Sequence, residues 1–230
     1  MDTVLFDLDG TLVDTLDDIT REANAALRQF GLPSLTRDEV RERVGEGGTA
    51  LIEASVRRSG RRIDSVVVAR AQETYLSGYA QRPAVAARLY PGAQQLLGRL
   101  RAAGVRTALC TNKAGPVTHR LLSALGLEPY FDAVITGDSA VGRKPAPGPL
   151  LHALDLVGGT SALMVGDSVH DLRAAQAAGM PVAWVNYGYG TPIGAGAPDL
   201  ELEDLDGLET AARAAGLDLP QSQMFGHIPV

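Results

Sequence analysis

The stretch TVLFDLDGT, residues 3–11, decides how the rest of the chain is interpreted. Its first four residues are rich in β-branched and aromatic side chains, which predicts a short buried strand. Asp7 follows this run directly, Asp9 comes two residues later, and Gly10 allows a sharp turn. Buried carboxylates are costly unless a cation or good donors meet them, so the pair indicates a metal site or a shared proton. Taken alone, the stretch fits a strand followed by an ordinary Asp-Gly turn equally well.

The composition is that of a globular protein. A chain of 230 residues can form one large domain or a domain with a sizeable insertion. Its 27 acidic and 21 basic residues argue against a nucleic-acid-binding surface. The acidic N-terminus does not fit a secretory signal, and no apolar run approaches the roughly 20 residues of a membrane span. The one cysteine, Cys110, is expected to be a buried strand residue. We therefore expect a cytoplasmic protein with no nucleic-acid or membrane partner, and we leave its oligomeric state open.

A block without predicted strands follows the opening turn. Four helices are expected in it, at residues 16–30, 37–43, 49–58 and 66–79. The glycine-rich segment VGEGG, residues 44–48, separates two of these helices and by itself is typical of a flexible connection. Because nothing between residues 14 and 84 has the pattern of a strand, this block is a candidate insertion into another domain.

Strands and helices alternate from residue 88 onward. The predicted strands are 105–110, 131–136, 162–165 and 182–185, and the predicted helices are 93–103, 117–125, 149–156 and 171–178. A short edge strand after Asp199 and a helix at 205–215 are expected next, and residues 220–230 are expected to be poorly ordered. This alternation implies a Rossmann-like α/β fold, with a mostly parallel sheet covered by helices on both faces.

Polar side chains follow four of the predicted strands, at the edge where an open parallel sheet binds its ligands. They are Asp7 and Asp9, then Thr111-Asn112-Lys113, then Lys144, and finally Asp167 with Asp171. Each has an ordinary explanation alone, such as a turn hydroxyl for Thr111, a solvated lysine for Lys144 and a helix cap for Asp167. Together, three carboxylates, a hydroxyl and a lysine suit a hard divalent cation and an anion, for which a phosphate group is the obvious candidate.

A phosphate ester bound at such an edge calls for two kinds of carboxyl chemistry. Phosphomonoester hydrolysis is among the slowest reactions that enzymes accelerate, mainly through positioning and charge neutralisation. A carboxylate nucleophile splits the reaction through an aspartyl phosphate. A second carboxylic acid protonates the leaving oxygen and then activates water.

Four ordered motifs resemble those of the haloacid dehalogenase-like phosphatases. They are Asp7-Leu8-Asp9-Gly10-Thr11, Thr111 after a strand, Lys144-Pro145, and Gly166-Asp167-Ser168 with Asp171. The resemblance extends from the first strand to about Gly190. In this family the helical block between the first two motifs is a mobile cap over the active site. We therefore predict an α/β core at residues 1–13 and 86–230 and a helical cap at residues 14–85.

The resemblance implies a role for each motif residue. Asp7 would be the nucleophile and Asp9 the general acid and base. Thr111 and the backbone at Asn112 would bind the phosphoryl oxygens, and Lys144 would offset charge on Asp7 and the phosphate.

The same resemblance implies a Mg²⁺ site. The ion would be held by Asp7, the backbone carbonyl of Asp9, and Asp167, with Asp171 supporting them through water or from behind the direct ligands. His170, beside Asp171, is expected to pack or to lie at the surface.

The substrate implied by the resemblance is a small phosphorylated metabolite. Relatives that displace a halide lack a carboxylate at the position of Asp9, so its presence points to phosphate esters. The segment RVGEGG (residues 43–48), Leu89-Tyr90-Pro91-Gly92 and Tyr187-Gly188-Tyr189-Gly190 are similar to phosphoglycolate phosphatases. The cap glycines Gly45 and Gly47 would then face the substrate. A cap arginine such as Arg43 would pair with the carboxylate of 2-phosphoglycolate, although a solvated helix face also explains Arg41 and Arg43.

Three alternatives stay open at this point. The same core serves sugar-phosphate mutases, which pass the phosphate to a second hydroxyl. Phosphatases of this kind also act on pyrophosphate or small sugar phosphates. A non-catalytic binding protein on this fold is the third, but such a protein needs no nucleophile and acid together.

Overall fold

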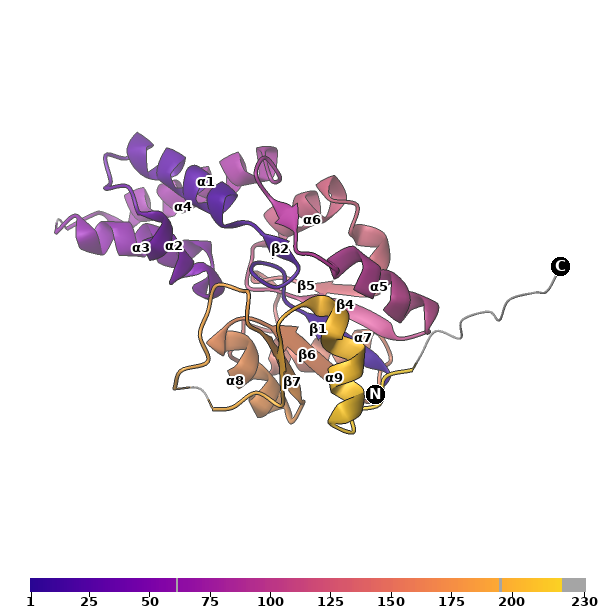
Figure 1. The fold of residues 1–230 in the computed structure, drawn as a ribbon. Coiled ribbons are helices and arrows are strands. Elements are labelled where there is room, and N and C mark those ends of the chain that lie inside the picture. The colour runs from indigo at the N-terminus through magenta and orange to yellow at the C-terminus, as the bar shows by residue number, and fades with distance from the viewer. Residues whose placement is uncertain (61, 195, 221–230) are drawn as a thin grey trace.

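A six-stranded parallel sheet is the centre of the computed structural model, which describes residues 1–60, 62–194 and 196–220 (Figure 1). The strands are β1 (Thr3–Phe6), β4 (Arg106–Cys110), β5 (Ala133–Ile135), β6 (Ala162–Gly166), β7 (Val182–Val185) and β8 (Leu200–Leu202). Their order across the sheet is β5-β4-β1-β6-β7-β8, and every neighbouring pair is parallel. This confirms the predicted α/β fold.

Strand β1 occupies the middle of the sheet and is buried on both faces. Val4 and Phe6 contribute to one apolar cluster, Leu5 contributes to the other, and all three side chains are fully buried. Strands β4 and β5 lie on one side of β1, whereas β6, β7 and β8, which come later in the sequence, lie on the other. Such a reversal of strand order opens a crevice at the carboxyl ends of the strands, which is where α/β sheets bind ligands.

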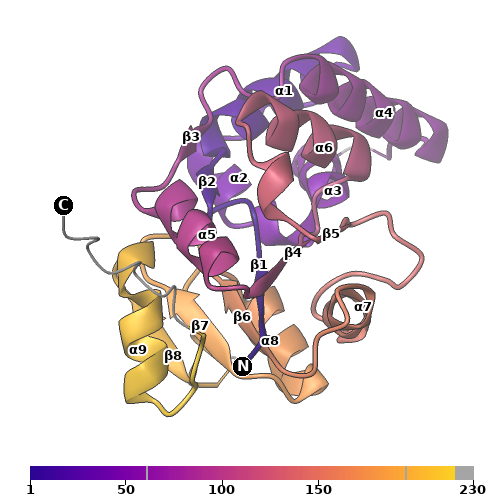
Figure 2. The same ribbon diagram turned by 90° about the vertical axis from the view of Figure 1, so that its right-hand side faces the viewer.

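Helices cover both faces of the sheet (Figure 2). Helices α5 (Ala93–Ala102) and α9 (Leu208–Ala214) pack with Val4 and Phe6, and α7 (Gly148–Leu156) and α8 (Val169–Ala178) pack with Leu5. Helix α6 (Gly115–Ala124) continues from the end of β4, and the short turns η2 (Glu128–Tyr130) and η3 (Leu205–Gly207) precede β5 and α9.

The helical unit, as we call α1 to α4, lies over the carboxyl edge of the sheet (Figure 1). It consists of α1 (Leu16–Gln29), α2 (Arg37–Arg41), η1 (Val44–Glu46), α3 (Gly48–Arg58) and α4 (Ser65–Gln81). These helices have an apolar core of their own, built around residues such as Leu27 and Ile52, and Val117 of α6 packs into it. The predicted domain boundaries at residues 14 and 85 stay a prediction.

Two short strands that were not predicted join the helical unit to the sheet. β2 (Val13–Asp14) and β3 (Arg88–Leu89) pair antiparallel, with Val13 opposite Leu89 and Asp14 opposite Arg88. The two connections between the parts therefore run side by side. A ladder of two residues on each strand is too short to produce the alternating pattern from which strands are predicted.

Within the described residues, no helix is long and apolar enough to cross a membrane. The segment expected to be poorly ordered, residues 220–230, lies outside the described residues apart from Pro220.

Candidate active site

Asp7 and Lys144 form a buried ion pair at the end of β1. Lys144 Nζ lies 2.9 Å from Asp7 Oδ1 and donates a hydrogen bond of 2.6 Å to Asp171 Oδ1. Burial raises the pKa of Asp7 to about 7, with Lys144 opposing this shift and Asp171 adding to it. Burial alone would lower the pKa of Lys144, but Asp171 and Asp7 raise it above its ordinary value. Lys144 is therefore a fixed positive charge beside two carboxylates.

Asp167 leaves β6 beside Asp7 and is held by two donors. Thr11 Oγ1 donates to Asp167 Oδ1 at 2.8 Å, and the Tyr189 backbone N–H donates to Oδ2 at 2.7 Å. Burial, followed by the charges of Asp7 and Asp171, raises the pKa of Asp167 to about 8. The turn after Asp7 fits closely against this carboxylate, because a Cβ on Gly10 would lie 2.3 Å from Oδ2. The sequence places a glycine there, at a φ of +87°.

The carboxylates of Asp7, Asp167 and Asp171 fit a divalent cation. Each offers one oxygen, and the three oxygens lie within 4.8 Å of one another. Among the residues that the structure describes, no donor meets Asp7 Oδ1 with hydrogen-bond geometry, although Lys144 is close to it. Hard cations bind such clusters of carboxylate oxygens. A bound cation would oppose the burial and the mutual repulsion that together raise the pKa of Asp7 and of Asp167.

Asp171 is more heavily engaged than the other two carboxylates. Its Oδ1 accepts from Lys144, and its Oδ2 accepts from the Ser168 backbone N–H at 3.0 Å and from Ser168 Oγ at 2.6 Å. Ser168 and Asp171 together cap the N-terminus of α8. Asp171 thus orients Lys144 and the start of α8 as well as contributing to the cluster.

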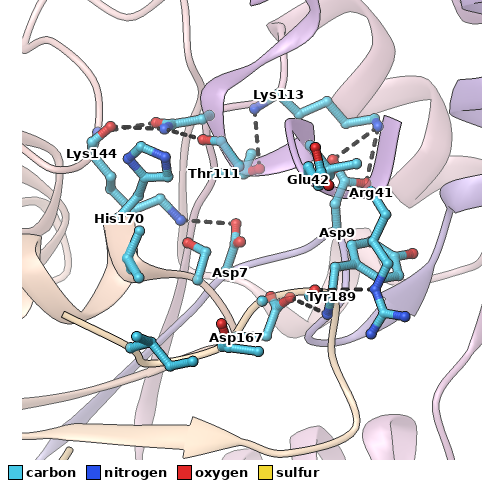
Figure 3. Close-up of a pocket in the computed structure, with 18 of the residues that line it drawn as sticks. Asp7, Asp9, Arg41, Glu42, Thr111, Lys113, Lys144, Asp167, His170 and Tyr189 are labelled. Carbon is cyan, nitrogen blue, oxygen red and sulfur yellow. Dashed lines mark hydrogen bonds and ion pairs between the residues drawn. The ribbon is translucent and has the colours of Figure 1, made fainter. Parts of the chain in front are cut away.

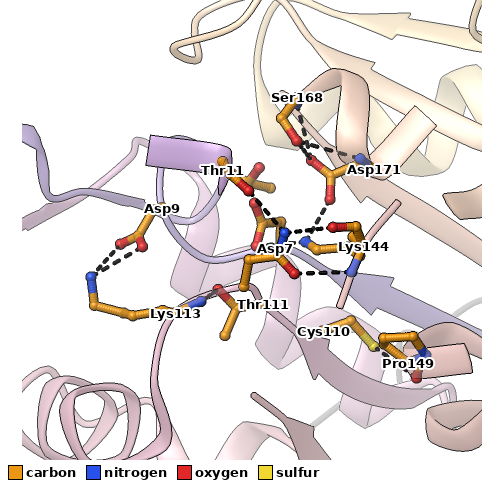
Figure 4. Close-up of polar contacts among 12 residues, drawn as sticks. Asp7, Asp9, Thr11, Cys110, Thr111, Lys113, Lys144, Pro149, Ser168 and Asp171 are labelled. Carbon is orange, nitrogen blue, oxygen red and sulfur yellow. Dashed lines mark hydrogen bonds and ion pairs between the residues drawn. The ribbon is translucent and has the colours of Figure 1, made fainter. Parts of the chain in front are cut away.

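The Asp9 carboxylate points toward Lys113, away from the cluster around Asp7 (Figure 4). Lys113 Nζ lies 3.0 Å from both carboxylate oxygens, and Thr15 Oγ1 donates to Oδ1 at 2.6 Å. Lys113 is itself buried, with only 8% of its surface exposed. The sequence places Lys113 among the polar residues at this edge of the sheet but assigns it no specific role. Its position two residues after Thr111 was the available signal, but nothing in the sequence pairs it with Asp9.

Asn112 ties the helical unit to the sheet through its side chain. Its Nδ2 donates to the carbonyl oxygens of Gly45 and Lys144, each at 2.8 Å, and its Oδ1 accepts from the Lys144 backbone N–H at 3.0 Å. The neighbouring Thr111 is buried at the end of β4, and its Oγ1 accepts from the Lys113 backbone N–H at 3.2 Å. The loop after β4 is therefore held between Lys144 and the glycine-rich segment.

These residues surround a cavity of about 650 Å³ between the sheet edge and the helical unit (Figure 3). The predicted site residues that line it are Asp7, Asp9, Gly45, Thr111, Asn112, Lys144 and Asp167. Gly45 lies against α8, because a Cβ there would be 2.9 Å from His170 Cδ2. Gly47 packs on the backbone of Asn112 and borders a smaller neighbouring cavity.

The structure does not bring Arg43 to the cavity. Arg43 Nη1 instead donates to the Glu39 carbonyl oxygen at 2.7 Å and lies 3.0 Å from the Glu42 carboxylate. Arg41, two residues earlier, lines the cavity in its place. Its Nε and Nη2 donate to the carbonyl oxygens of Tyr189 and Gly188, each at 3.1 Å.

Tyr189 and His170 are two further cavity residues to which the sequence assigned no role. The Tyr189 hydroxyl accepts from the Thr15 backbone N–H at 2.7 Å and donates to Asp14 Oδ1 at 2.7 Å, so it contacts the connection into the helical unit. His170 was expected to pack or to lie at the surface. It borders the cavity, and within the described residues its buried Nδ1 has no hydrogen-bond partner.

Comparison with known proteins places these features in a family. The family model described as haloacid dehalogenase-like hydrolase matches residues 4–185. A phosphoglycolate phosphatase of Nitrosococcus oceani is 37% identical over 207 residues, covering 88% of this chain and 92% of the relative. Another from Rhodospirillum rubrum is 42% identical over 194 residues, covering 81% of this chain and 80% of the relative.

Solved structures agree with these matches. A crystal structure described as a predicted phosphoglycolate phosphatase from Haemophilus somnus has a TM-score of 0.84 and 28% identity, covering 90% of this chain and 96% of that one. CbbY from Rhodobacter sphaeroides, solved in complex with phosphate, has a TM-score of 0.77 and 26% identity, covering 89% of this chain and 94% of that one.

Proposed function

Because the chain belongs to the haloacid dehalogenase-like hydrolases, we propose that it is a Mg²⁺-dependent phosphatase whose substrate is 2-phosphoglycolate. The observation that carries this proposal is the cluster of Asp7, Asp167 and Asp171 around Lys144 at the base of a cavity. The choice of substrate is supported by relatives that align over most of the chain and are named phosphoglycolate phosphatases. A cytoplasmic location belongs to the same proposal.

The proposed reaction has two steps at Asp7. In the first, a carboxylate oxygen of Asp7 attacks phosphorus, the bond from phosphorus to the glycolate oxygen breaks, and Asp9 protonates that oxygen. In the second, water attacks phosphorus, Asp9 takes a proton from it, and the bond from phosphorus to Asp7 breaks. Glycolate and inorganic phosphate are the products.

The residues around Asp7 would stabilise the negative charge that develops on the phosphoryl group in these steps. Lys144 stays positive and offsets the charge of Asp7 and the phosphate, and Thr111 with the backbone at Asn112 accommodates the phosphoryl oxygens. Mg²⁺, held by Asp7 and Asp167 with Asp171 in support, would neutralise negative charge on the phosphoryl group. Positive charge at the bottom of the cavity also favours the ionised form of the Asp7 carboxylate, which is the form that attacks phosphorus.

The helical unit would act as the cap that closes the cavity. Gly45 contacts the sheet edge through the Asn112 hydrogen bond and packs against His170, so the glycine-rich segment borders the space where the substrate binds. Arg41, rather than Arg43, would meet the carboxylate of 2-phosphoglycolate, and its position in the lining of the cavity supports this role. Its two backbone contacts hold the guanidinium in place while other N–H groups remain available.

A second candidate is a phosphatase for a larger sugar phosphate. The cavity volume of about 650 Å³ is in the middle of the range of about 300–1,000 Å³ typical of small-molecule sites. CbbY, which shares the fold, has also been solved with xylulose-(1,5)bisphosphate. The size of the cavity therefore keeps sugar phosphates under consideration.

A substrate panel distinguishes the two candidates. Purified protein with Mg²⁺ is assayed for phosphate release from 2-phosphoglycolate, pyrophosphate, glucose 1-phosphate, xylulose 1,5-bisphosphate and nucleotides. We expect the kcat/KM for 2-phosphoglycolate to exceed every other by at least 10-fold. Comparable low rates on all of these compounds would contradict the proposed substrate, and a preference for the bisphosphate would establish the second candidate.

A further inference from the structure

A buried lysine, Lys113, contacts the proposed general acid Asp9 (Figure 4). A further hydrogen bond links it to the helical unit. Lys113 Nζ lies 3.0 Å from both oxygens of Asp9 and donates to the Tyr79 hydroxyl at 3.1 Å. The same nitrogen lies 4.3 Å from the centre of the Tyr79 ring, within the range of a cation–π contact. Tyr79 is fully buried near the end of α4. Asp9, Lys113 and Tyr79 therefore form a continuous contact from the sheet edge into the helical unit.

The direction of the Asp9 side chain matters for the first chemical step. In an in-line displacement, the leaving oxygen lies on the side of phosphorus opposite the attacking atom. Asp7 attacks from the base of the cavity, so a proton donor for the leaving oxygen has to lie toward the helical unit. The Asp9 carboxylate points that way, toward Lys113 (Figure 4).

We propose that Lys113 is a positioning residue for Asp9, and that Tyr79 makes this positioning depend on how the helical unit is seated on the sheet. This inference rests on the proposed role of Asp9 as the general acid and base. Thr15 holds one carboxylate oxygen, whereas Lys113 contacts both. A buried ammonium group that lies equally far from both oxygens fixes the direction of the carboxylate, and the hydrogen bond from Thr15 fixes its rotation. Lys113 in turn is held from the other side by the ring and hydroxyl of Tyr79.

Comparing two kinds of leaving group tests this inference. An alkyl phosphate such as 2-phosphoglycolate needs a proton on its leaving oxygen, whereas 4-nitrophenolate is a stable anion and leaves without one. The value of kcat/KM reports the steps up to release of the leaving group. Loss of positioning of Asp9 should therefore lower kcat/KM for the alkyl phosphate and leave that for 4-nitrophenyl phosphate much less affected.

The main variant is Lys113→Met, which keeps the length of the side chain and removes its charge. We expect the fall in kcat/KM for the alkyl phosphate to be about 10- to 100-fold larger than the fall for 4-nitrophenyl phosphate. Loss of positioning should cost less than loss of the general acid itself, which usually contributes about 100- to 10,000-fold. An equal fall with both substrates would mean that Lys113 only supports the structure or binds phosphate, and would overturn the inference. No fall with either substrate would overturn it as well.

Two tyrosine variants on α4 complete the experiment. Tyr79→Phe removes one hydroxyl and keeps the ring. It should lower the ratio of kcat/KM for the alkyl phosphate to kcat/KM for 4-nitrophenyl phosphate by a few fold. It also carries the test if Lys113→Met does not fold. Tyr75→Phe is the matched control. The centre of the Tyr75 ring lies 5.9 Å from that of the Tyr79 ring, but the hydrogen bond from Lys113 goes to Tyr79. Tyr75→Phe should leave the ratio unchanged, and a shift as large as that of Tyr79→Phe would contradict the inference.

Failure of the proposed substrate would look different. If the wild-type protein does not hydrolyse 2-phosphoglycolate, the proposed function is contradicted, whereas the role proposed for Lys113 is not. The same ratio is then measured with glycerol 2-phosphate, another alkyl phosphate.

Discussion

The side-chain amide of Asn112 donates a hydrogen bond of 2.8 Å to the carbonyl oxygen of Gly45 and so joins the sheet edge to the helical unit. The same side chain also contacts the backbone of Lys144 through both its nitrogen and its oxygen. One residue therefore connects the glycine-rich segment, the loop after β4 and the backbone of the lysine beside Asp7. The seating of the helical unit is thereby coupled to the geometry at the base of the cavity.

Replacing Asn112 should affect stability and substrate binding together. Asn112→Ala leaves the buried backbone groups of Lys144 and the half-buried carbonyl oxygen of Gly45 without their partner, which costs about 1–3 kcal/mol of unfolding free energy. We expect KM to rise several-fold because the glycine-rich segment is no longer held over the cavity. Urea unfolding and steady-state kinetics measure the two effects.

Asn24 provides the matched control for this variant. Its side chain makes a similar pair of contacts, donating to the Leu35 carbonyl oxygen at 2.9 Å and accepting from the Leu35 backbone N–H at 2.8 Å. Both partners lie in the helical unit, away from the cavity. Asn24→Ala should lose comparable stability with an unchanged KM. A rise in KM of the same size in both variants would show that general destabilisation, and not the contact with Gly45, is responsible.

The choice between Arg41 and Arg43 is testable with one pair of variants. Arg41→Gln should raise KM for 2-phosphoglycolate by about 10- to 100-fold, because a charge-assisted hydrogen bond to a carboxylate contributes about 1.5–3 kcal/mol. KM for 4-nitrophenyl phosphate, which has no carboxylate, should hardly change. Arg43→Gln should leave both values near those of the wild type. A selective rise in KM for Arg43→Gln would restore the assignment expected from the sequence.

Stability without metal should decrease as pH rises. The pKa of Asp7 is raised to about 7 and that of Asp167 to about 8, from an ordinary value of 3.8. Between these limits the folded chain binds more protons than the unfolded chain, so the free energy of unfolding falls with pH. In the presence of a chelator, the contribution of these two groups should therefore lower Tm as the pH is raised from about 4 to about 8. Differential scanning calorimetry measures this trend.

Added Mg²⁺ should counteract the loss, and more strongly at high pH. The ion binds the ionised carboxylates, so its stabilising effect should be larger at pH 8 than at pH 5. Asp167→Asn serves as the control, because it removes one of the two titrating groups and should flatten the dependence on pH in the chelated protein. A Mg²⁺ effect that is larger at pH 5 would contradict the assignment of this cluster as the cation site.

Much of the fold was predictable because its signals are local. Strands β1 and β7 have the predicted bounds, since each is a short apolar run between turn residues. The site was predictable to the extent that it depends on topology. Once parallel strands are expected, the residues that follow them must meet at one edge, as Asp7, Thr111 and Asp167 do.

The rest depends on three-dimensional contacts that have no local pattern. Arg41 and Arg43 lie two residues apart, and which of them faces the cavity depends on where α2 ends and η1 begins. The pairing of Lys113 with Asp9 joins residues 104 positions apart in sequence. The β2–β3 ribbon is too short for any periodicity. These features emerge only when the helical unit is placed against the sheet.

Removing the Asp7 carboxylate should separate activity from stability. Asp7→Asn has no nucleophile, so kcat for 2-phosphoglycolate should fall by at least about 1,000-fold. The metal-free variant should be at least as stable as the wild type at pH 8, because it lacks one of three mutually repelling buried carboxylates. Circular dichroism and thermal unfolding verify the fold. Substantial Mg²⁺-dependent turnover by this variant would remove Asp7 from the role of nucleophile.

Rapid quenching in acid, followed by peptide mass spectrometry, tests the central claim most directly. Enzyme mixed with Mg²⁺ and 2-phosphoglycolate should acquire one phosphoryl group on the peptide that contains Asp7, and this group should appear and decay at rates that account for turnover. Asp7→Asn should acquire none. Steady release of phosphate from 2-phosphoglycolate while Asp7 stays unmodified at every quench time would contradict the account.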